Sequence, residues 1–352
     1  MSNIASREVP LKDGEGIQTP TVTICLPLKP SVLKKYNLSS SFLYELDNLN
    51  ISRFPEDKTL TQIYLEASNI LEKDFEISLM KTQNEKIGDL KIGIQNLNGN
   101  QIEVRETFSA FSKFCYRINF ENSMLTGDYL IFLVKIKKEN PEEIKHMELI
   151  LSDPKSTLVL IYGMTDGISG FRTKFSFEDR SSVYQILIRE EKMENLFCSD
   201  EFDSFDQCAI TKWIESKFCP CLSVYQYGFT HVLKNPTSLN FCAKISEEFC
   251  WMTNKNTSMR NLFKVCKPNC KTTDYIFSRA DYTVGPSEDR QVNFVIFAPY
   301  ASYKESREYL VYDIPDFIGT IGGSLGLFIG FSFFDFAGKV IDYLAKCLEK
   351  YR

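Results

Sequence analysis

The chain has 352 residues, and 41 Lys and Arg against 46 Asp and Glu give a formal net charge of −5. At about 150 residues per domain, this length predicts two or three domains. Because no basic surplus is available to displace counterions from phosphates, the charge argues against nucleic-acid binding as the main activity. The only two histidines, His146 and His231, leave little scope for zinc chemistry or histidine-based catalysis.

Periodic segments predict the elements of the chain in order. Residues 1–20 carry five charges and no apolar core, so they are not a signal peptide. Apolar residues at helical spacing predict a helix over residues 60–73, and a second helix is expected over residues 210–217 beside Trp213. Branched and aromatic residues predict strands over 157–162 and 292–297. The segment from 21 to 316 is therefore expected to be a mixed α and β domain.

The cysteines indicate an oxidising compartment. Eight of the eleven lie between Cys198 and Cys270, a density that is typical of a disulfide framework. The alternative is a zinc cluster that uses Cys219 with Cys221 and Cys266 with Cys270, but the usual CxxC pairs are absent. Three N-glycosylation sequons, at Asn37, Asn50 and Asn256, agree with an exported chain.

One apolar segment lies near the C-terminus. Residues 317–334 contain no charge and reach the lower limit of bilayer length, so we expect a membrane helix over residues 317–344. A buried core helix is the alternative. Basic residues after the segment, Lys346, Lys350 and Arg352, predict a cytoplasmic tail over residues 345–352. Cys347 then lies on the reducing side, which accounts for the odd cysteine.

Glycines form a stripe along this segment. Gly319, Gly322, Gly323, Gly326 and Gly330 follow helical spacing and fall on one face. A smooth face allows another helix to approach closely, which favours oligomers in the lipid bilayer. So many glycines also weaken a helix. A local break in the helix that lines a water-filled path fits the same pattern.

Three short motifs carry a resemblance to a known family. Residues 321–332, IGGSLGLFIGFS, resemble the second transmembrane helix of the degenerin, epithelial sodium channel and acid-sensing ion channel family. Residues 21–25, TVTIC, are similar to the strand that follows the family's first transmembrane helix, and residues 115–119, CYRIN, to its CYxFN strand. The motifs stand in the family's order, and the resemblance covers nearly the whole chain from residue 20.

The resemblance implies a function. Subunits of this family assemble as homo- or hetero-trimers around a cation pore, usually selective for Na⁺ and often blocked by amiloride. They lie in the plasma membrane as two-helix, multi-pass subunits with a large extracellular domain of palm, finger and thumb parts. The permeant Na⁺ is the only ion implied, no cofactor or bound metal is expected, and the family contains no enzymes. Motifs of hydrolases, metalloproteases and P-loop proteins are also absent.

The resemblance also assigns pore residues. Gly330, Phe331 and Ser332 stand where the family has its narrow selectivity belt, at which backbone carbonyls replace the water around the ion. The middle residue is usually small, so Phe331 either packs outward between helices or narrows the path. Asp313 and Asp316 are expected to form an outer acidic ring that concentrates cations. The alternative is that these two acids are ordinary solvated residues beside a helix.

A nested ladder of disulfides is implied in the same way. In a thumb-like region over residues 195–272, it joins Cys198 to Cys270, Cys208 to Cys266, Cys219 to Cys250 and Cys221 to Cys242. A fifth bridge, Cys25 to Cys115, joins two strands elsewhere. The family often has one more rung, and both of its positions hold lysine here, Lys212 and Lys264.

The family's first transmembrane helix has no counterpart in these 352 residues, so the chain is expected to be part of a longer channel subunit. Two other readings stay open. One is a non-conducting regulatory or truncated subunit that joins other family members through the glycine stripe. The other is a membrane-anchored extracellular binding protein. The gating stimulus and the partner subunits cannot be read from the sequence.

Overall fold

The structure is a computed structural model, and part of the chain is described. The described residues are 2–11, 16–38, 60–82, 85–97, 99–109, 113–121, 124–125, 129–137, 144, 146–152, 170–176, 180–195, 197–202, 207–208, 211–212, 221, 242, 247, 265–267, 269–286, 291–297, 302–310, 319, 321–323 and 333–350. The chain divides into two compact units. The larger is Ser6–Ser306, and the smaller combines Met1–Ala5 with Arg307–Arg352.

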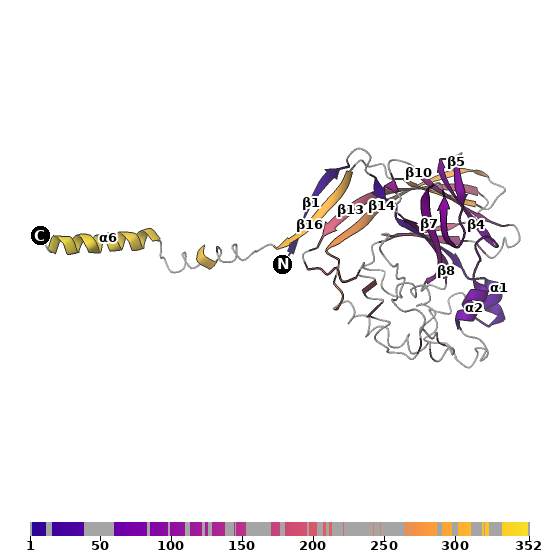
Figure 1. Cartoon of the computed structure of the whole chain (residues 1–352), viewed down its shortest axis with the longest axis horizontal. Coiled ribbons are helices and arrows are strands. Elements are labelled where there is room, and N and C mark those ends of the chain that lie inside the picture. The colour runs from indigo at the N-terminus through magenta and orange to yellow at the C-terminus, as the bar shows by residue number, and fades with distance from the viewer. Residues whose placement is uncertain are drawn as a thin grey trace. The chain divides into compact units, whose positions relative to one another are not determined.

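Two large sheets dominate the described residues (Figure 1). The first has the strand order β1 (Ser2–Pro10), β16 (Ser302–Leu310), β13 (Arg180–Glu194), β15 (Gln291–Phe297), β10 (Tyr129–Ile136), β4 (Phe75–Thr82) and β5 (Glu85–Asp89), with β14 (Lys271–Pro286) paired to β13. The second has the order β12 (Gly170–Ser176), β11 (His146–Ser152), β3 (Thr21–Pro27), β8 (Lys113–Glu121), β7 (Asn100–Ser109) and β6 (Gly93–Leu97). A short pair joins β2 (Ile17–Gln18) to β9 (Met124–Leu125), and the longest helices of the described residues are α1 (Pro30–Lys35), α2 (Leu60–Ala67) and α6 (Phe333–Lys350).

Aromatic side chains from both sheets form the centre of the core in the larger unit. Phe132 of β10 stacks on Phe294 of β15 with ring centroids 4.6 Å apart. Phe120 of β8 meets Phe132 edge-on at 5.9 Å, and Phe175 of β12 lies 6.2 Å from Phe294. Each such side chain contributes about 1.5–3 kcal/mol when it is fully buried. The two sheets are therefore held face to face by aromatic contacts.

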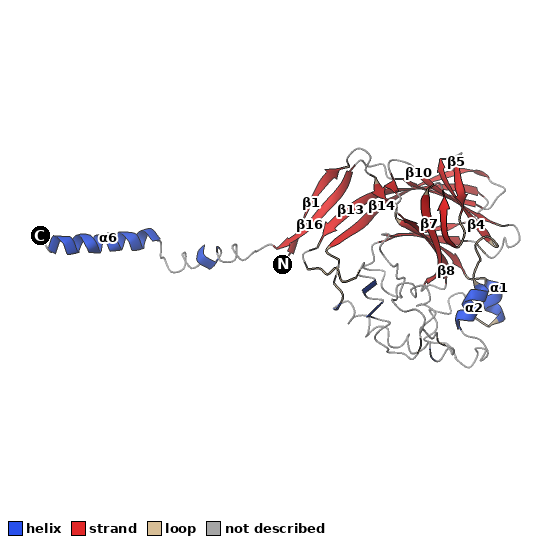
Figure 2. Ribbon diagram, viewed as in Figure 1, coloured by secondary structure: helices blue, strands red, loops and turns tan. Residues whose placement is uncertain are grey.

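The predicted fold class is supported in part. The described residues are rich in strands (Figure 2). They also contain four disulfides, as expected of a disulfide-rich extracellular domain. Helices are a smaller share than the mixed α and β prediction implied. The predicted strand at 292–297 is confirmed as β15, and its alternating burial places Val292, Phe294 and Ile296 in the core. Most other strands, β1 and β2 among them, were not predicted individually.

The helix predicted over residues 60–73 is wrong in its second half, because α2 ends at Ala67. After it, the Asp74 carboxylate accepts the backbone N–H of Ile70 at 2.7 Å. Glu72 adopts a left-handed conformation with φ of 73°, which a helix does not contain. The turn that replaces the helix is thus stabilised by a side chain at its own end.

Tyr116 of β8 closes this turn from the neighbouring strand. Its buried hydroxyl accepts the backbone N–H of Leu71 at 3.0 Å and donates to the carbonyl of Asn69 at 2.8 Å. Burial raises the pKa of this hydroxyl well above its usual range, so Tyr116 stays protonated and able to donate. Two backbone groups that a helix would pair internally are paired here with a side chain 45 and 47 residues away in the sequence.

Glu106 offers a test of pH dependence. It follows Ile102 and Val104 at period two, so it points to the apolar face of β7, and burial raises the pKa of its carboxyl. The folded state therefore binds this proton more tightly than the unfolded state. Ionisation of Glu106 therefore destabilises the folded state. This loss of stability is absent below pH 4.5, the ordinary pKa of the carboxyl, and is complete once the pH exceeds the raised pKa.

We expect Glu106→Gln to raise the melting temperature at pH 7.5 by about 2 °C and to leave it unchanged at pH 4. Thermal unfolding of the two proteins at both pH values measures this difference. Glu103→Gln is the matched control, because Glu103 lies on the opposite face of the same strand and pairs with Arg105 at 2.5 Å. An equal gain at both pH values would show that charge burial is not the cause.

Several sequence predictions fall outside the described residues. The expected strand at 157–162 is one of them. Of the helix expected over residues 210–217, only Thr211 and Lys212 are described, and both are helical.

Candidate functional site

The predicted pore segment is described in two pieces. Gly319 and residues 321–323 are helical and exposed, and a Cβ added at Gly319, Gly322 or Gly323 would meet no atom within 4 Å. The other predicted pore residues, Asp313, Asp316, Gly326, Gly330, Phe331 and Ser332, lie outside the described residues. The structure therefore describes three of the five glycines in the predicted stripe, and all three are exposed.

Helix α6 starts directly after the predicted selectivity residues. It runs without interruption from Phe333 to Lys350, past the predicted end of the membrane segment at 344. Its apolar residues Val340, Ile341, Tyr343 and Leu344 are exposed. Charged residues recur through the helix and lower its mean hydropathy. Among the described residues, no helix is both long and apolar enough to cross a bilayer.

In the larger unit, a network of polar side chains around the buried Ser306 joins β1, β16 and β13. Ser306 of β16 is completely buried, and its hydroxyl donates to Glu191 Oε1 of β13 at 2.7 Å. Because this proton is used, the Ser6 hydroxyl of β1, 3.0 Å away, is the donor to Ser306. Lys304 Nζ lies 2.6 Å from the same Glu191 oxygen. The Glu191 carboxylate of β13 thus binds two side chains of β16 and, through Ser306, is linked to β1.

Side chains on the alternate positions of β16 add weaker contacts. Arg7 of β1 pairs with Glu305 at 2.5 Å, but the Arg7 side chain is 75% exposed. The ammonium of Lys192 lies 4.0 Å from the centre of the Tyr303 ring. Ion pairs in solvent usually contribute less than about 1 kcal/mol. The network around Glu191 is therefore the stronger connection along β16, the strand from which the chain enters the smaller unit.

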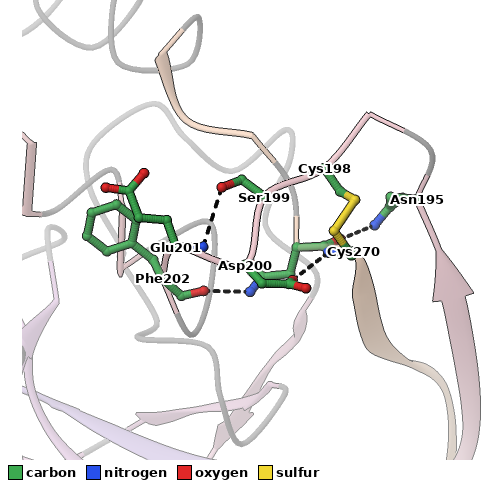
Figure 3. Close-up of a disulfide and its surroundings, with 8 residues drawn as sticks. Asn195, Cys198, Ser199, Asp200, Glu201, Phe202 and Cys270 are labelled. Carbon is green, nitrogen blue, oxygen red and sulfur yellow. Dashed lines mark hydrogen bonds between the residues drawn. A yellow bond between two sulfur atoms is a disulfide. The ribbon is translucent and has the colours of Figure 1, made fainter.

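The cysteine-rich region begins between β13 and β14, where a disulfide joins Cys198 to Cys270 (Figure 3). Asn195, directly after β13, donates its backbone N–H to the carbonyl of Cys270 at 2.9 Å. The Cys270 N–H in turn donates to the Asp200 carboxylate at 2.9 Å. The Asn195 side-chain amide donates to the carbonyl of Asn269 at 2.7 Å. One disulfide and three hydrogen bonds thus hold together the two ends of the segment that connects β13 to β14.

A second contact extends this closure into the loop 198–202. The Asn269 amide donates to the Phe202 carbonyl at 2.7 Å, so the residue before Cys270 is bound to the loop that follows Cys198. The Phe202 ring packs against the next bridge, Cys208 to Cys266. The base of the cysteine-rich region is therefore cross-linked covalently twice and by hydrogen bonds between the bridges.

The described residues contain four of the five disulfides that the resemblance implies, three of them in the nested ladder. They are Cys25–Cys115, Cys198–Cys270, Cys208–Cys266 and Cys221–Cys242. The remaining pair, Cys219 with Cys250, lies outside the described residues. Cys347 of α6 is free. The sulfurs of Cys221 and Cys242 and a Glu247 carboxylate oxygen lie within 4.8 Å of one another, but bonded sulfurs are not the thiolate ligands that zinc requires.

The other predicted positions are placed as follows. Asn37 is exposed directly after α1, with φ of 54°, and stays a predicted glycosylation site. Asn50 and Asn256 lie outside the described residues. His146 is exposed at the start of β11, and His231 lies outside the described residues.

Sequence reasoning missed the network around Glu191. Glu191 belongs to a run of charged residues in β13, and a charged run in a sequence ordinarily indicates a solvated strand. The two serines, Ser6 and Ser306, are 300 positions apart. Only the pairing of β1 with β16 brings them together, so no local signal marks them.

Comparison with known proteins identifies the family. The model of the family described as amiloride-sensitive sodium channel matches residues 4–337. None of the curated proteins matches the chain. Among solved structures, the chain is similar to a cryo-EM structure of a proton-activated chloride channel, with a TM-score of 0.35 and 7% identity over 98% of this chain and 86% of that one. That likeness is too distant to carry an argument. On the family match over nearly its whole length, the chain belongs to the amiloride-sensitive sodium channel family, whose members are ion channels and not enzymes.

Proposed function

We propose that the chain is a subunit of a trimeric, sodium-selective channel in the plasma membrane. In this proposal the cysteine-rich domain is extracellular, and the C-terminal segment lines the pore. The family match over residues 4–337 is the observation that carries it. The four disulfides support an extracellular location, because such bonds persist in oxidising compartments.

The selectivity belt in this proposal is Gly330, Phe331 and Ser332. These residues lie between helical residues at 321–323 and the start of α6 at Phe333. A glycine permits an extended backbone, and its carbonyl then faces the ion in place of water. Asp313 and Asp316 would raise the local concentration of cations at the outer end.

Opening would depend on the strands that lead from the cysteine-rich region. The disulfide Cys198–Cys270 joins the ends of β13 and β14, which pair along their whole lengths. Glu191 of β13 then holds Ser306 and Lys304 of β16. A movement of the cysteine-rich region is thereby passed to β16 and along the chain to the pore segment.

Current measurements test the proposal. The chain is expressed in cells alone and together with other subunits of the family, and reversal potentials are recorded while external Na⁺ is replaced by a large organic cation. In a Cys347→Ala background, Ser332→Cys should make the current sensitive to a small cationic thiol reagent, and amiloride should reduce it. Absence of current in both settings, with a monomeric protein at the surface, would contradict the proposal.

Phe331 favours a second candidate function, a non-conducting regulatory subunit. A phenyl ring directed toward the axis would block the path that a small residue leaves open. This candidate predicts no current from the chain alone and an altered current from a co-expressed subunit. Phe331→Ala should then produce current, whereas Phe334→Ala, a matched control just beyond the belt, should not.

Glu191→Gln should disturb the connection between the strands and the pore. It removes the charge that pairs with Lys304 and weakens the bond to the buried Ser306, a loss of about 1.4 kcal/mol if charge-assisted bonds have their usual strength. We expect the ratio of open to closed channels to change by up to about tenfold. Single-channel recording measures this ratio.

The control for this prediction is Glu305→Gln, which removes a carboxylate from the neighbouring strand β16. Its partner Arg7 is largely exposed, so the open-to-closed ratio should change less than about twofold. Equal effects of the two substitutions would show that general surface charge, and not the Glu191 network, sets the equilibrium.

A further inference from the structure

Along β3, β8 and β11 of the six-stranded sheet, one face is polar yet buried. The strands alternate, so residues two apart share a face, and the apolar set, including Ile24 and Tyr116, forms the core on the other side. The opposite face, here called the polar face, consists of Thr21, Thr23 and Cys25 of β3, Cys115, Arg117 and Asn119 of β8, and Glu148, Ile150 and Ser152 of β11. All of these except Asn119 are less than 9% exposed. A buried sheet face of this composition requires an account of its hydrogen bonds.

Part of the polar face is paired within the protein. The Thr21 hydroxyl donates to Asn119 Oδ1 at 2.9 Å, and Arg117 Nε donates to the same oxygen at 3.2 Å. Two other hydroxyls have no such partner. Thr23 Oγ1 and Ser152 Oγ form no hydrogen bond in the structure, although each residue is only 1% exposed. A buried hydroxyl without a partner is unfavourable and uncommon in native proteins.

The two unpaired hydroxyls are close neighbours. Thr23 lies opposite Ile150 in the pairing of β3 with β11, and Ser152 lies opposite Thr21. Thr23 and Ser152 are therefore diagonal neighbours on the same face, a relation that places side chains roughly 7 Å apart or less. Two hydrogen bonds of about 2.8 Å to one shared atom span at most about 5.6 Å, which lies within the upper limit of this distance.

We propose that the polar face holds an ordered water molecule that bridges Thr23 Oγ1 and Ser152 Oγ. A buried water normally satisfies polar groups that lack other partners and needs a polar surrounding. Thr21, Asn119 and Arg117 provide that surrounding on the adjacent positions.

The test is a double-mutant cycle on the full chain in detergent. Thr23→Val and Ser152→Ala each remove one hydroxyl with little change of shape. Each should lower the melting temperature by about 2–4 °C, because the bridging water loses a partner. The double variant should melt no lower than the less stable single variant, because both hydroxyls bind the same molecule. A density map that resolves water should show a peak between the two oxygens.

The opposite results overturn the proposal. If either single variant melts higher than the parent, its hydroxyl had no partner at all. If the two effects add, the hydroxyls bind separate groups. Thr23→Ser, which keeps the hydroxyl, guards against a packing artefact and should leave the coupling to Ser152→Ala intact. Ser68→Ala is the control, because the Ser68 hydroxyl donates to the Leu65 carbonyl at 2.7 Å and its effect should add to that of Thr23→Val.

Discussion

Replacing Cys25 and Cys115 together with alanine is expected to lower the free energy of unfolding by about 4 kcal/mol. The bridge closes a loop of 90 residues, so its loss greatly increases the freedom of the unfolded chain. Both cysteines are completely buried and stand opposite each other in β3 and β8. The variant also leaves a void beside Ile150, which packs against the bridge. Denaturant unfolding and the amount of protein at the cell surface measure the effect.

The matched control is Cys347→Ala, which removes the free cysteine of α6. It should change neither the stability nor the surface level. The single variant Cys25→Ala should be about as unstable as the double variant, because one cysteine cannot form the bridge. Unchanged denaturation of the double variant would show that sheet packing alone holds these two strands together.

Asp74→Asn is expected to lower the free energy of unfolding by about 3 kcal/mol. The Asp74 carboxylate lies 2.9 Å from Lys29 Nζ, and the side chains are only 3% and 13% exposed. The same residue accepts the backbone N–H of Ile70 and, through its carbonyl, that of Lys137. Asparagine can keep these bonds but leaves the Lys29 charge nearly buried without its partner. Thermal and denaturant unfolding of the purified chain measure the loss.

Two further variants separate the buried charge from general charge effects. Lys29→Met in the Asp74→Asn background removes the unpaired ammonium and should restore part of the stability. Glu66→Gln breaks the ion pair of Lys35 with Glu66, which joins α1 to α2 but is 62% and 34% exposed. It should lower the free energy of unfolding by less than about 1 kcal/mol. A loss as large as that of Asp74→Asn would contradict the role assigned to burial.

Local sequence patterns predicted an element correctly where burial of one face was the main influence on the backbone. Alternating branched and aromatic residues sufficed for β15, because one face of that strand packs on the core. The same reasoning failed for residues 68–73, where helical spacing continues but the backbone turns. There Asp74 and Tyr116 bind the N–H groups of Ile70 and Leu71. Hydrogen bonds to the Asp74 and Tyr116 side chains outweighed a local preference for helix that amounts to less than about 1 kcal/mol per residue.

The predicted pore and the Glu191 network differ in the same way. The pore residues were assigned from a continuous motif, IGGSLGLFIGFS, which needs no tertiary information to be recognised. The network of Ser6, Ser306 and Glu191 has no motif, since its members come from three strands that are distant in the sequence.

The sequence by itself determined the family and, through the resemblance, the four cysteine pairs of the described residues. These depend on residue identities in order along the chain, and covalent partners tolerate few substitutions. Only the tertiary structure decided where α2 ends, which carboxylate joins β13 to β16, and that a sheet face bearing Thr23 and Ser152 is buried. Each of these depends on atoms that sheet pairing brings within about 3 Å of each other, at distances in sequence over which local preferences carry no information.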